Sequence, residues 1–155
     1  MVRIRAYVDT SVFGGVRDAE FARASEEVME RARRGDILLV VSRMVLRELD
    51  RAPEDVRKAL EALPPECLEF VEVDADVEGL AAAYLRAGIL AEASRDDAIH
   101  VAAATVARAD VILSWNFRHI VNYDRIRKYN AVNILNGFRT IDIRSPMEMT
   151  DANDH

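Results

Sequence analysis

The sequence contains very little cysteine, glycine or proline. Cys67 is the one cysteine among 155 residues, so no internal disulfide can form and a structural zinc site is not expected. Six glycines and four prolines are too few for a low-complexity chain, and half of the residues are hydrophobic. These shortages leave an ordinary globular protein of one domain's length, large enough to bury a core without covalent cross-links.

Long hydrophobic runs are also missing. No apolar stretch approaches the roughly 18 residues that a membrane-spanning helix requires. The first residues, MVRIRAYVD, lack the hydrophobic region of a signal peptide. We therefore expect a cytoplasmic protein that has no contact with a membrane.

Positive charge is in short supply as well. The formal net charge is −6, which excludes a broad cationic surface that would hold nucleic acid by neutralising phosphates alone. Any contact with nucleic acid must then be local. Two clusters of basic residues are candidates for it: Arg31, Arg33 and Arg34, and Arg125, Arg127 and Lys128.

Strand-like and helix-like patterns alternate along the chain. This order predicts a single α/β domain over residues 1–145, with a mostly parallel central sheet and helices on both faces. Ser42 is placed to cap the helix that follows it. Gly35 and Gly137 are placed to end helices, and the polar tail, residues 146–155, is predicted to be disordered. The predicted strands are 4–8, 37–41, 68–73, 111–113 and 140–143, and the predicted helices are 21–34, 43–52, 53–63, 77–90, 94–105 and 126–135.

The stretch from Ser94 to Asn116 joins an acidic helix start to a buried strand. Ser94 and Asp97 have the spacing of a capping box, which predicts a helix that begins near Ser94 with both side chains bonded to its first turn. The apolar run 111–113 predicts a buried strand that ends in Ser114, Trp115 and Asn116. Function is not needed to explain the acids, because the helix dipole favours them in a first turn by about 0.3–1 kcal/mol.

Two other acids stand at the edges of apolar elements. Asp9 follows the first predicted strand, and Glu48 lies beside the buried stripe of the helix after the second. Ordinary alternatives exist, since Asp9 can cap a turn with Thr10 and Ser11, and Glu48 can form an ion pair. Open α/β sheets bind ligands at the carboxyl ends of their strands, where the strand order reverses. We therefore expect these acids and Asp97 to share one cleft.

Such a cleft has the composition of a magnesium site. Asp9, Glu48, Asp97 and Asn116 all offer oxygen atoms, which favour Mg²⁺ or Mn²⁺ over zinc. Two carboxylates 4 Å apart repel by about 4 kcal/mol at an effective dielectric constant of about 20, so the group needs protons or cations. A bound ion would activate water and neutralise a phosphate, which suits phosphodiester hydrolysis.

Four motifs carry a resemblance to a known family. The segments AYVDTSVFGG, SRMVLREL, DDAIHVAAA and ILSWNFRHI, in this order, resemble the PIN-domain family and in particular its VapC-like toxin branch. The resemblance covers roughly residues 4 to 143. It implies a three-layer PIN fold, Mg²⁺- or Mn²⁺-dependent ribonuclease activity, and often a homodimer inhibited by a partner antitoxin. The family's four acidic positions fall on Asp9, Glu48, Asp97 and Asn116.

Other residues receive secondary roles. Ser11 matches the hydroxyl that commonly supports the first acid of the family, and Asn116 departs from it, because many members carry Asp there. Asp96 can compensate for the missing charge or face solvent. His100, one turn after Asp97, can contact phosphate or pack as an ordinary helix histidine. Arg118, or the cluster from Arg125 to Lys128, is expected to meet RNA.

Two functions stay open at this stage. The leading hypothesis is a metal-dependent endoribonuclease, the toxin of a type II toxin–antitoxin pair. The alternative is a weakly active or inactive PIN-like interaction module that acts through dimerisation, which the uncharged Asn116 favours. Phosphotransfer receivers and haloacid-type phosphatases fit poorly, because the second acid that each requires near Asp9 is absent.

Overall fold

The computed structural model describes residues 3–151, which fold around one five-stranded sheet. All strands are parallel, in the order β3-β2-β1-β4-β5. Val8 pairs with Leu113 on one side of β1, and Tyr7 pairs with Val40 on the other. The predicted α/β fold with a parallel central sheet is thus confirmed. The strands are β1 (Ile4–Val8), β2 (Ile37–Ser42), β3 (Leu68–Val71), β4 (Val111–Leu113) and β5 (Asp142–Arg144).

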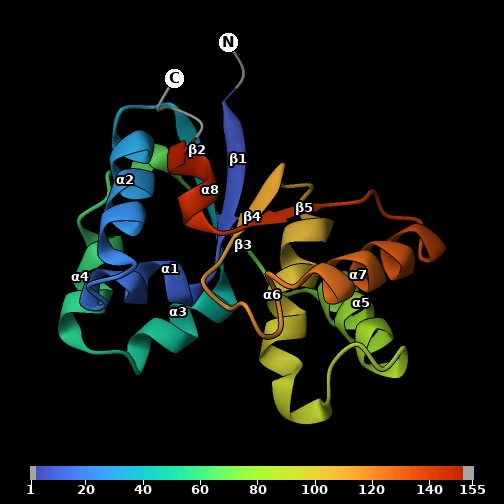
Figure 1. Ribbon diagram of the computed structural model, residues 1–155. Helices are drawn as coiled ribbons and strands as arrows, with labels where there is room; N and C mark the ends of the chain where they lie inside the picture. Colours follow the sequence, from blue (N-terminus) through green and yellow to red (C-terminus); the bar gives the residue numbers. More distant parts are fainter. Residues whose placement is uncertain (1–2, 152–155) are drawn as a thin grey trace.

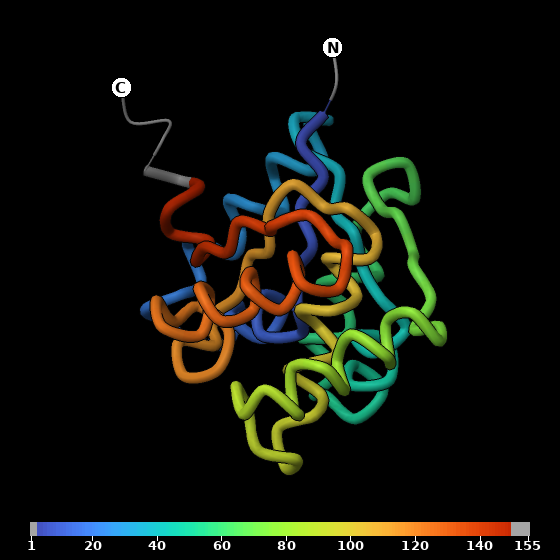
Figure 2. Tube along the Cα trace, turned by 90° about the vertical axis from the view of Figure 1, so that its right-hand side faces the viewer, coloured from blue at the N-terminus to red at the C-terminus, as the bar shows by residue number. Residues whose placement is uncertain are grey.

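Helices cover both faces of this sheet. In Figure 1 α1, α2, α4 and α8 lie on one side of the strands, and α5, α6 and α7 lie on the other. Figure 2, viewed from that second side, shows α7 (orange) across the front of the molecule and α5 (yellow-green) below it. The α-helices are α1 (Thr10–Gly14), α2 (Ala22–Arg33), α3 (Arg43–Asp50), α4 (Glu54–Glu61), α5 (Ala75–Arg86), α6 (Arg95–Val106), α7 (Tyr123–Leu135) and α8 (Pro146–Asp151), and the 3₁₀ turns are η1 (Gly15–Arg17), η2 (Pro65–Cys67) and η3 (Glu92–Ser94).

Helix α6 is buried on all its sides over most of its length. Every residue from Ala98 to Thr105 is buried, and the helix contacts α3, α5, β2 and β4. A helix that is apolar all round belongs in a core, and its small alanines allow close approach by its neighbours. The first turn of α6, which carries Asp96 and Asp97, is thereby fixed relative to the sheet.

Two predicted helix caps are wrong in their bonding, although the boundaries are close. Ser94 precedes α6 and Ser42 precedes α3 as expected, but neither hydroxyl bonds to the helix that it precedes. Ser94 ends the 3₁₀ turn η3, while the Ser42 hydroxyl bonds to Tyr7. Asp97 does not close a capping box and instead bonds to His119. Polar partners from distant segments thus bond to the Ser42 and Asp97 side chains in place of the helix backbone.

The segment predicted as a disordered tail begins with a helix. Residues Pro146–Asp151 form α8, which lies against α2. Arg31 of α2 donates a hydrogen bond to the carbonyl oxygen of Met149 at 3.1 Å, and Met149 packs against the core. One residue of the first candidate basic cluster thus supports the C-terminal helix. Residues 152–155 lie outside the described part of the chain.

The strand order reverses between β1 and β4. From β1 the chain moves outward through β2 to β3, and then returns across the sheet to β4 and β5. Loops that leave the carboxyl ends of β1 and β4 therefore diverge and leave room for side chains between them. Asp9 follows β1 directly, and Ser114 follows β4. The expected switch point is present, and two polar residues stand at it.

Candidate active site at the carboxyl edge of the sheet

Asp9 is a buried carboxylate held by two serine hydroxyls. Its side chain is 4% exposed. Ser11 donates a hydrogen bond to Oδ1 at 2.6 Å, and Ser114 donates one to Oδ2 at 2.8 Å. Burial raises the pKa of the Asp9 carboxyl, against the lowering effects of the His100 charge and of both serines. No Lys, Arg or His among residues 3–151 forms an ion pair with Asp9, so the hydrogen bonds to its carboxylate come from two neutral hydroxyl groups.

Glu48 is held between the start of α1 and the centre of α6. Thr10 donates a hydrogen bond to Oε1 of Glu48 at 2.7 Å. Nε2 of His100 lies 2.6 Å from the same oxygen. The other ring nitrogen of His100, Nδ1, is hydrogen-bonded to the Tyr7 hydroxyl at 2.7 Å, which in turn is hydrogen-bonded to Ser42. A polar chain thus runs from β2 through the core to Glu48.

The charges around His100 explain the protonation preferences of this pair. Burial alone would lower the pKa of the His100 imidazole. The hydrogen bond to Glu48 and the charges of Asp9 and Asp97 all act in the opposite direction and together outweigh burial, so the pKa of His100 is raised. Burial likewise pushes the pKa of the Glu48 carboxyl upward, but His100 and Thr10 overcome it and lower that pKa. All three predicted acids therefore act on one buried histidine.

Asp97 and Asn116 are joined through His119. Nδ1 of His119 lies 2.8 Å from Oδ2 of Asp97. The backbone N–H of His119 donates to the Asn116 amide oxygen at 2.9 Å. The backbone N–H of Asn116 donates to Ser114, the residue that also bonds to Asp9. The turn after β4 therefore connects the first and third acids by a continuous series of hydrogen bonds.

Comparison with solved structures identifies proteins that share this architecture. A chain of the crystal structure of VapBC2 from Rickettsia felis, bound to a DNA fragment from their promoter, matches with a TM-score of 0.60 and 12% identity, over 92% of this chain and 98% of that chain. VapC20 of Mycobacterium tuberculosis, a sarcin–ricin loop cleaving toxin, matches with a TM-score of 0.55 and 20% identity, over 74% and 92%. This chain has the PIN fold of the VapC toxins. No model of a known protein family matches the sequence, and no curated protein matches it significantly.

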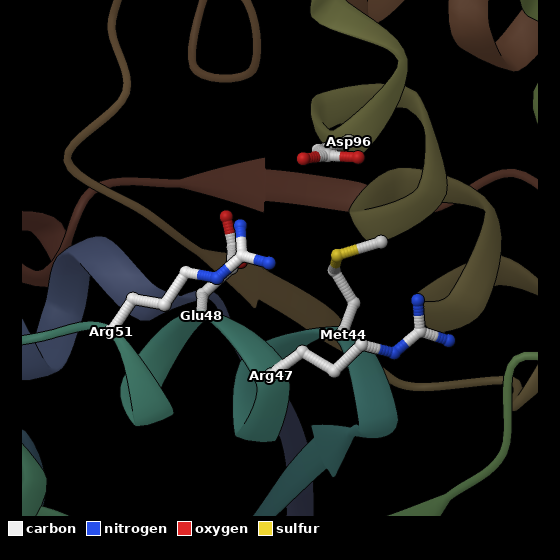
Figure 3. Close-up of a pocket in the computed structure, with 5 residues that line it drawn as sticks. All are labelled: Met44, Arg47, Glu48, Arg51 and Asp96. Atoms are coloured by element: carbon white, nitrogen blue, oxygen red, sulfur yellow. The ribbon is translucent and has the colours of Figure 1, made fainter.

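Within this VapC-like fold, the other predicted residues have different environments. Ser11 contacts Asp9 as expected. His100 is 2% exposed, and both of its ring nitrogens have protein partners. Asp96 and Arg118 are exposed, and Asp96 lines a cavity together with Glu48. Figure 3 shows Asp96 on α6, opposite the side chains of α3.

Several residues that support the acids were not singled out in the sequence as members of the site. Thr10, Ser114 and Tyr7 contact a predicted site residue, and His119 contacts Asp97. Thr10 and Ser114 neighbour predicted site residues, so their hydroxyls were a usable signal. Tyr7 and His119 gave none, because their side-chain directions depend on packing and on the path of the loop after β4.

The oxygen donors of the candidate site fit a magnesium ion in their chemistry. Mg²⁺ commonly takes one or two carboxylates and completes its shell with water and substrate phosphate. Asp9 offers a buried carboxylate without a directly bonded cation, which an ion would stabilise. Among residues 3–151, no group of three or more His, Cys, Asp and Glu side chains is gathered as a metal-binding cluster. A shared ion for Asp9, Glu48 and Asp97 therefore stays a prediction.

In the described segment, none of the helices has the length and hydrophobicity that crossing a bilayer requires.

Proposed function

We propose that this protein is a Mg²⁺- or Mn²⁺-dependent endoribonuclease that hydrolyses RNA phosphodiester bonds. The observation that carries the proposal is the placement of Asp9, Glu48 and Asp97 around His100, at the switch point of a VapC-like sheet. VapC20, which shares the fold, is a toxin that cleaves the sarcin–ricin loop. Fold likeness at 20% identity does not carry activity across, so the local chemistry has to support it.

The protein's own residues supply positioning. Asp9, Glu48, Asp97 and Asn116 are the residues that would hold the ion, which when bound acidifies water and neutralises phosphate charge. Ser11 and Ser114 fix both oxygens of Asp9. His100 and His119 fix one oxygen each of Glu48 and Asp97. Carboxylates oriented in advance need little rearrangement when they receive an ion and a substrate.

The proposal includes partners and a cellular role. The R. felis match is a VapBC2 complex on promoter DNA. On that basis we propose that this chain is the toxin of a type II toxin–antitoxin pair, with an antitoxin partner, a homodimeric state and a cytoplasmic location. Co-expression with the neighbouring reading frame, followed by purification of a complex, tests this part.

Asp9→Asn separates metal binding from folding. The amide removes a buried charge but keeps the shape, so we expect unchanged or greater stability in EDTA. Saturating Mn²⁺ should stabilise the wild type by about 2.7 kcal/mol at roughly 100 times its Kd. The variant should show little stabilisation and no metal-dependent RNA cleavage. Thermal unfolding and a gel assay of RNA cleavage measure both. An Asp9→Asn protein that cleaves RNA at the wild-type rate would refute the mechanism.

A second candidate is a PIN-like interaction module with little or no catalysis, acting through dimerisation. Asn116 favours it, because the amide carries no charge and its oxygen already accepts the backbone N–H of His119. Calorimetric titration with Mn²⁺ distinguishes the two. Failure of the wild type to bind Mn²⁺ at millimolar concentration would leave the interaction module as the function.

A further inference from the structure

A small cavity opens directly beside the candidate active site. Its volume is about 160 Å³, and its lining residues are Met44, Arg47, Glu48, Arg51 and Asp96. Since one water takes roughly 30 Å³ in the liquid, the space accepts a group much larger than a water molecule. Glu48 belongs both to this cavity and to the group of acids around His100. Whatever binds here therefore lies next to the proposed reaction centre.

Two arginines of this cavity have no partner in residues 3–151. Arg47 and Arg51 are exposed and form no ion pair or side-chain hydrogen bond there. At the other end of the same helix, Arg43 is paired with Glu72 at 2.9 Å. Arg47 and Arg51 lie one helical turn apart, before and after Glu48. Figure 3 shows their guanidinium groups on either side of the Met44 side chain.

The chemistry of this lining favours phosphate over a base. No aromatic side chain lines the cavity, so it offers no ring on which a base could stack. Guanidinium groups are planar forks that match phosphate oxygens. The lining also holds two carboxylates, Glu48 and Asp96, so in a chain with a net charge of −6 the unpaired guanidinium groups are the points at which a polyanion can be held.

We propose that Arg47 and Arg51 each bind a backbone phosphate of a single-stranded RNA that enters the site past Glu48. This inference rests on the proposed nuclease function and assigns its substrate contact to α3 and the residue that caps its C-terminus, rather than to Arg118 or to the cluster from Arg125 to Lys128. Each phosphate neutralised on a single strand contributes about −0.7 to the slope of log Kobs against log[salt].

The test is the salt dependence of RNA binding in EDTA, measured by fluorescence anisotropy with the full chain and a short labelled single-stranded RNA. Arg47→Ala/Arg51→Ala should reduce the magnitude of the slope by about 1.4, and each single variant should reduce it by about 0.7. As the NaCl concentration rises from about 50 to about 200 mM, the ratio of the wild-type affinity to that of the double variant should then fall roughly sevenfold. Arg47→Lys/Arg51→Lys should keep most of the slope.

A matched control carries the same change in net charge. Arg23 on α2 and Arg86 on α5 are exposed, do not line the cavity, and form no ion pair with the described residues. Arg23→Ala/Arg86→Ala should leave the slope near the wild-type value. An equal loss of slope in this control would overturn the proposal, because it would show a general charge effect.

The remaining outcomes separate the two proposals. If the wild type cleaves RNA with Mg²⁺ and Arg47→Ala/Arg51→Ala keeps the wild-type salt slope, the phosphate assignment fails and the nuclease proposal stands. The two arginines would then be candidates for contact with a protein partner. If the slope falls as expected but the wild type does not cleave RNA with Mg²⁺ or Mn²⁺, the nuclease fails and the phosphate assignment stands. Absence of RNA binding by the wild type in EDTA overturns the phosphate assignment, and absence of cleavage with Mg²⁺ or Mn²⁺ overturns the nuclease.

Discussion

His100 shows how one buried polar side chain organises the candidate site. It is 2% exposed, and it joins the Tyr7 hydroxyl on one side to Glu48 on the other. A buried polar group is costly unless its hydrogen bonds are made, and a fully bonded network is correspondingly rigid. The orientation of the Glu48 carboxylate is therefore set from within the core as well as by Thr10.

The Tyr7–His100 contact should be measurable as an energetic coupling. We expect Tyr7→Phe to lower the free energy of unfolding by about 1–2 kcal/mol, because the hydrogen bonds to His100 and Ser42 are lost. His100→Ala should cost about 2–4 kcal/mol, since it opens a cavity and leaves the Tyr7 hydroxyl with one partner. The double variant should show a coupling of about 0.5–3 kcal/mol.

Urea denaturation of the wild type, the two single variants and the double variant measures this coupling as a double-mutant cycle. Thr10→Val serves as a reference on the opposite side of Glu48, because it removes a hydrogen bond to the same oxygen without touching Tyr7. Strictly additive losses in Tyr7→Phe and His100→Ala would mean that the polar chain does not act as a unit.

At this scale the sequence indicated where the acids lie but not how they are held. Asp9 and Glu48 were predictable because strand ends and helix faces follow from hydrophobic periodicity. The contact between Asp97 and His119 spans 22 positions and depends on how the loop after β4 turns back. No local pattern encodes that turn, so the capping box, a purely local rule, predicted a different partner for Asp97.

Among the elements, the corner where η1 meets α2 and the end of β4 is tightly packed. The Trp115 indole donates to the Ser25 hydroxyl at 2.8 Å, and its ring stacks on Phe21 with centroids 4.1 Å apart. Gly15 lies against this pair: a Cβ there would be 2.3 Å from Ser25 Oγ and 2.8 Å from Trp115 Nε1. The absence of a side chain at Gly15 is what lets the two elements meet.

Gly15→Ala should therefore destabilise the protein by about 1–3 kcal/mol through overpacking. Trp115 is the single tryptophan, so its emission reports directly on the corner. Gly14→Ala is the matched control, because a Cβ at Gly14 meets nothing within 4 Å. At Gly14, a helical residue, alanine should be neutral or stabilising by up to about 1 kcal/mol. Equal stability of both variants, or an unshifted Trp115 emission in Gly15→Ala, would argue against the packing described.

The contact between α5 and α7 contains two buried tyrosines. Tyr84 donates a hydrogen bond to the Asn133 amide oxygen at 2.5 Å, and its ring meets Tyr129 edge to face at 4.8 Å. Burial raises the pKa of the Tyr84 phenol above its ordinary value. Because the folded-state pKa is the higher one, the neutral phenol contributes fully below the unfolded pKa of about 10, and this contribution is lost as pH rises from there.

Tyr84→Phe should make stability less sensitive to alkaline pH. Near neutrality the variant should be less stable by about 1–3 kcal/mol, because the Asn133 oxygen loses its donor. Between about pH 9 and about pH 11, the wild type should lose roughly 1.4 kcal/mol more than the variant, the contribution of one tyrosine that ionises only when unfolded. Denaturant titrations at both pH values measure this difference. Tyr123→Phe, at an exposed position of α7, should follow the wild type.

Most element boundaries were predictable, whereas helices α1 and α8 were not among the predicted elements. Gly35 and Gly137 adopt positive φ values of 83° and 82° after α2 and α7, as their positions indicated. Helix α8 was missed because its residues are polar and lie at the end of the chain. It forms because Arg31 donates a hydrogen bond to the Met149 carbonyl oxygen and the Met149 side chain packs against the core. Composition does not reveal such tertiary contacts.

On the scale of the whole molecule, one core runs through the sheet. Buried residues from β1, β2, β4 and β5 form a single cluster with residues from helices on both faces. The four strands that carry Tyr7, Val40, Ile112 and Ile143 are parallel, so most contacts across the sheet join segments distant in sequence. Parallel pairing of this kind gives little stability to isolated fragments, because neighbouring strands depend on the crossover helices between them.

A single core of this type should unfold as one unit. We expect urea to produce one transition with the same midpoint by Trp115 fluorescence and by far-ultraviolet circular dichroism, since the first reports the corner near α2 and the second reports all the helices. Gly15→Ala, at that corner, should shift both midpoints together. If α5 and α7 formed a separate unit, the variant would move the fluorescence midpoint and leave a second dichroism transition in place. If that separate unit also included α6, Asp97 at the head of α6 would be detached from the half of the molecule that holds Asp9, which would contradict the proposed shared site.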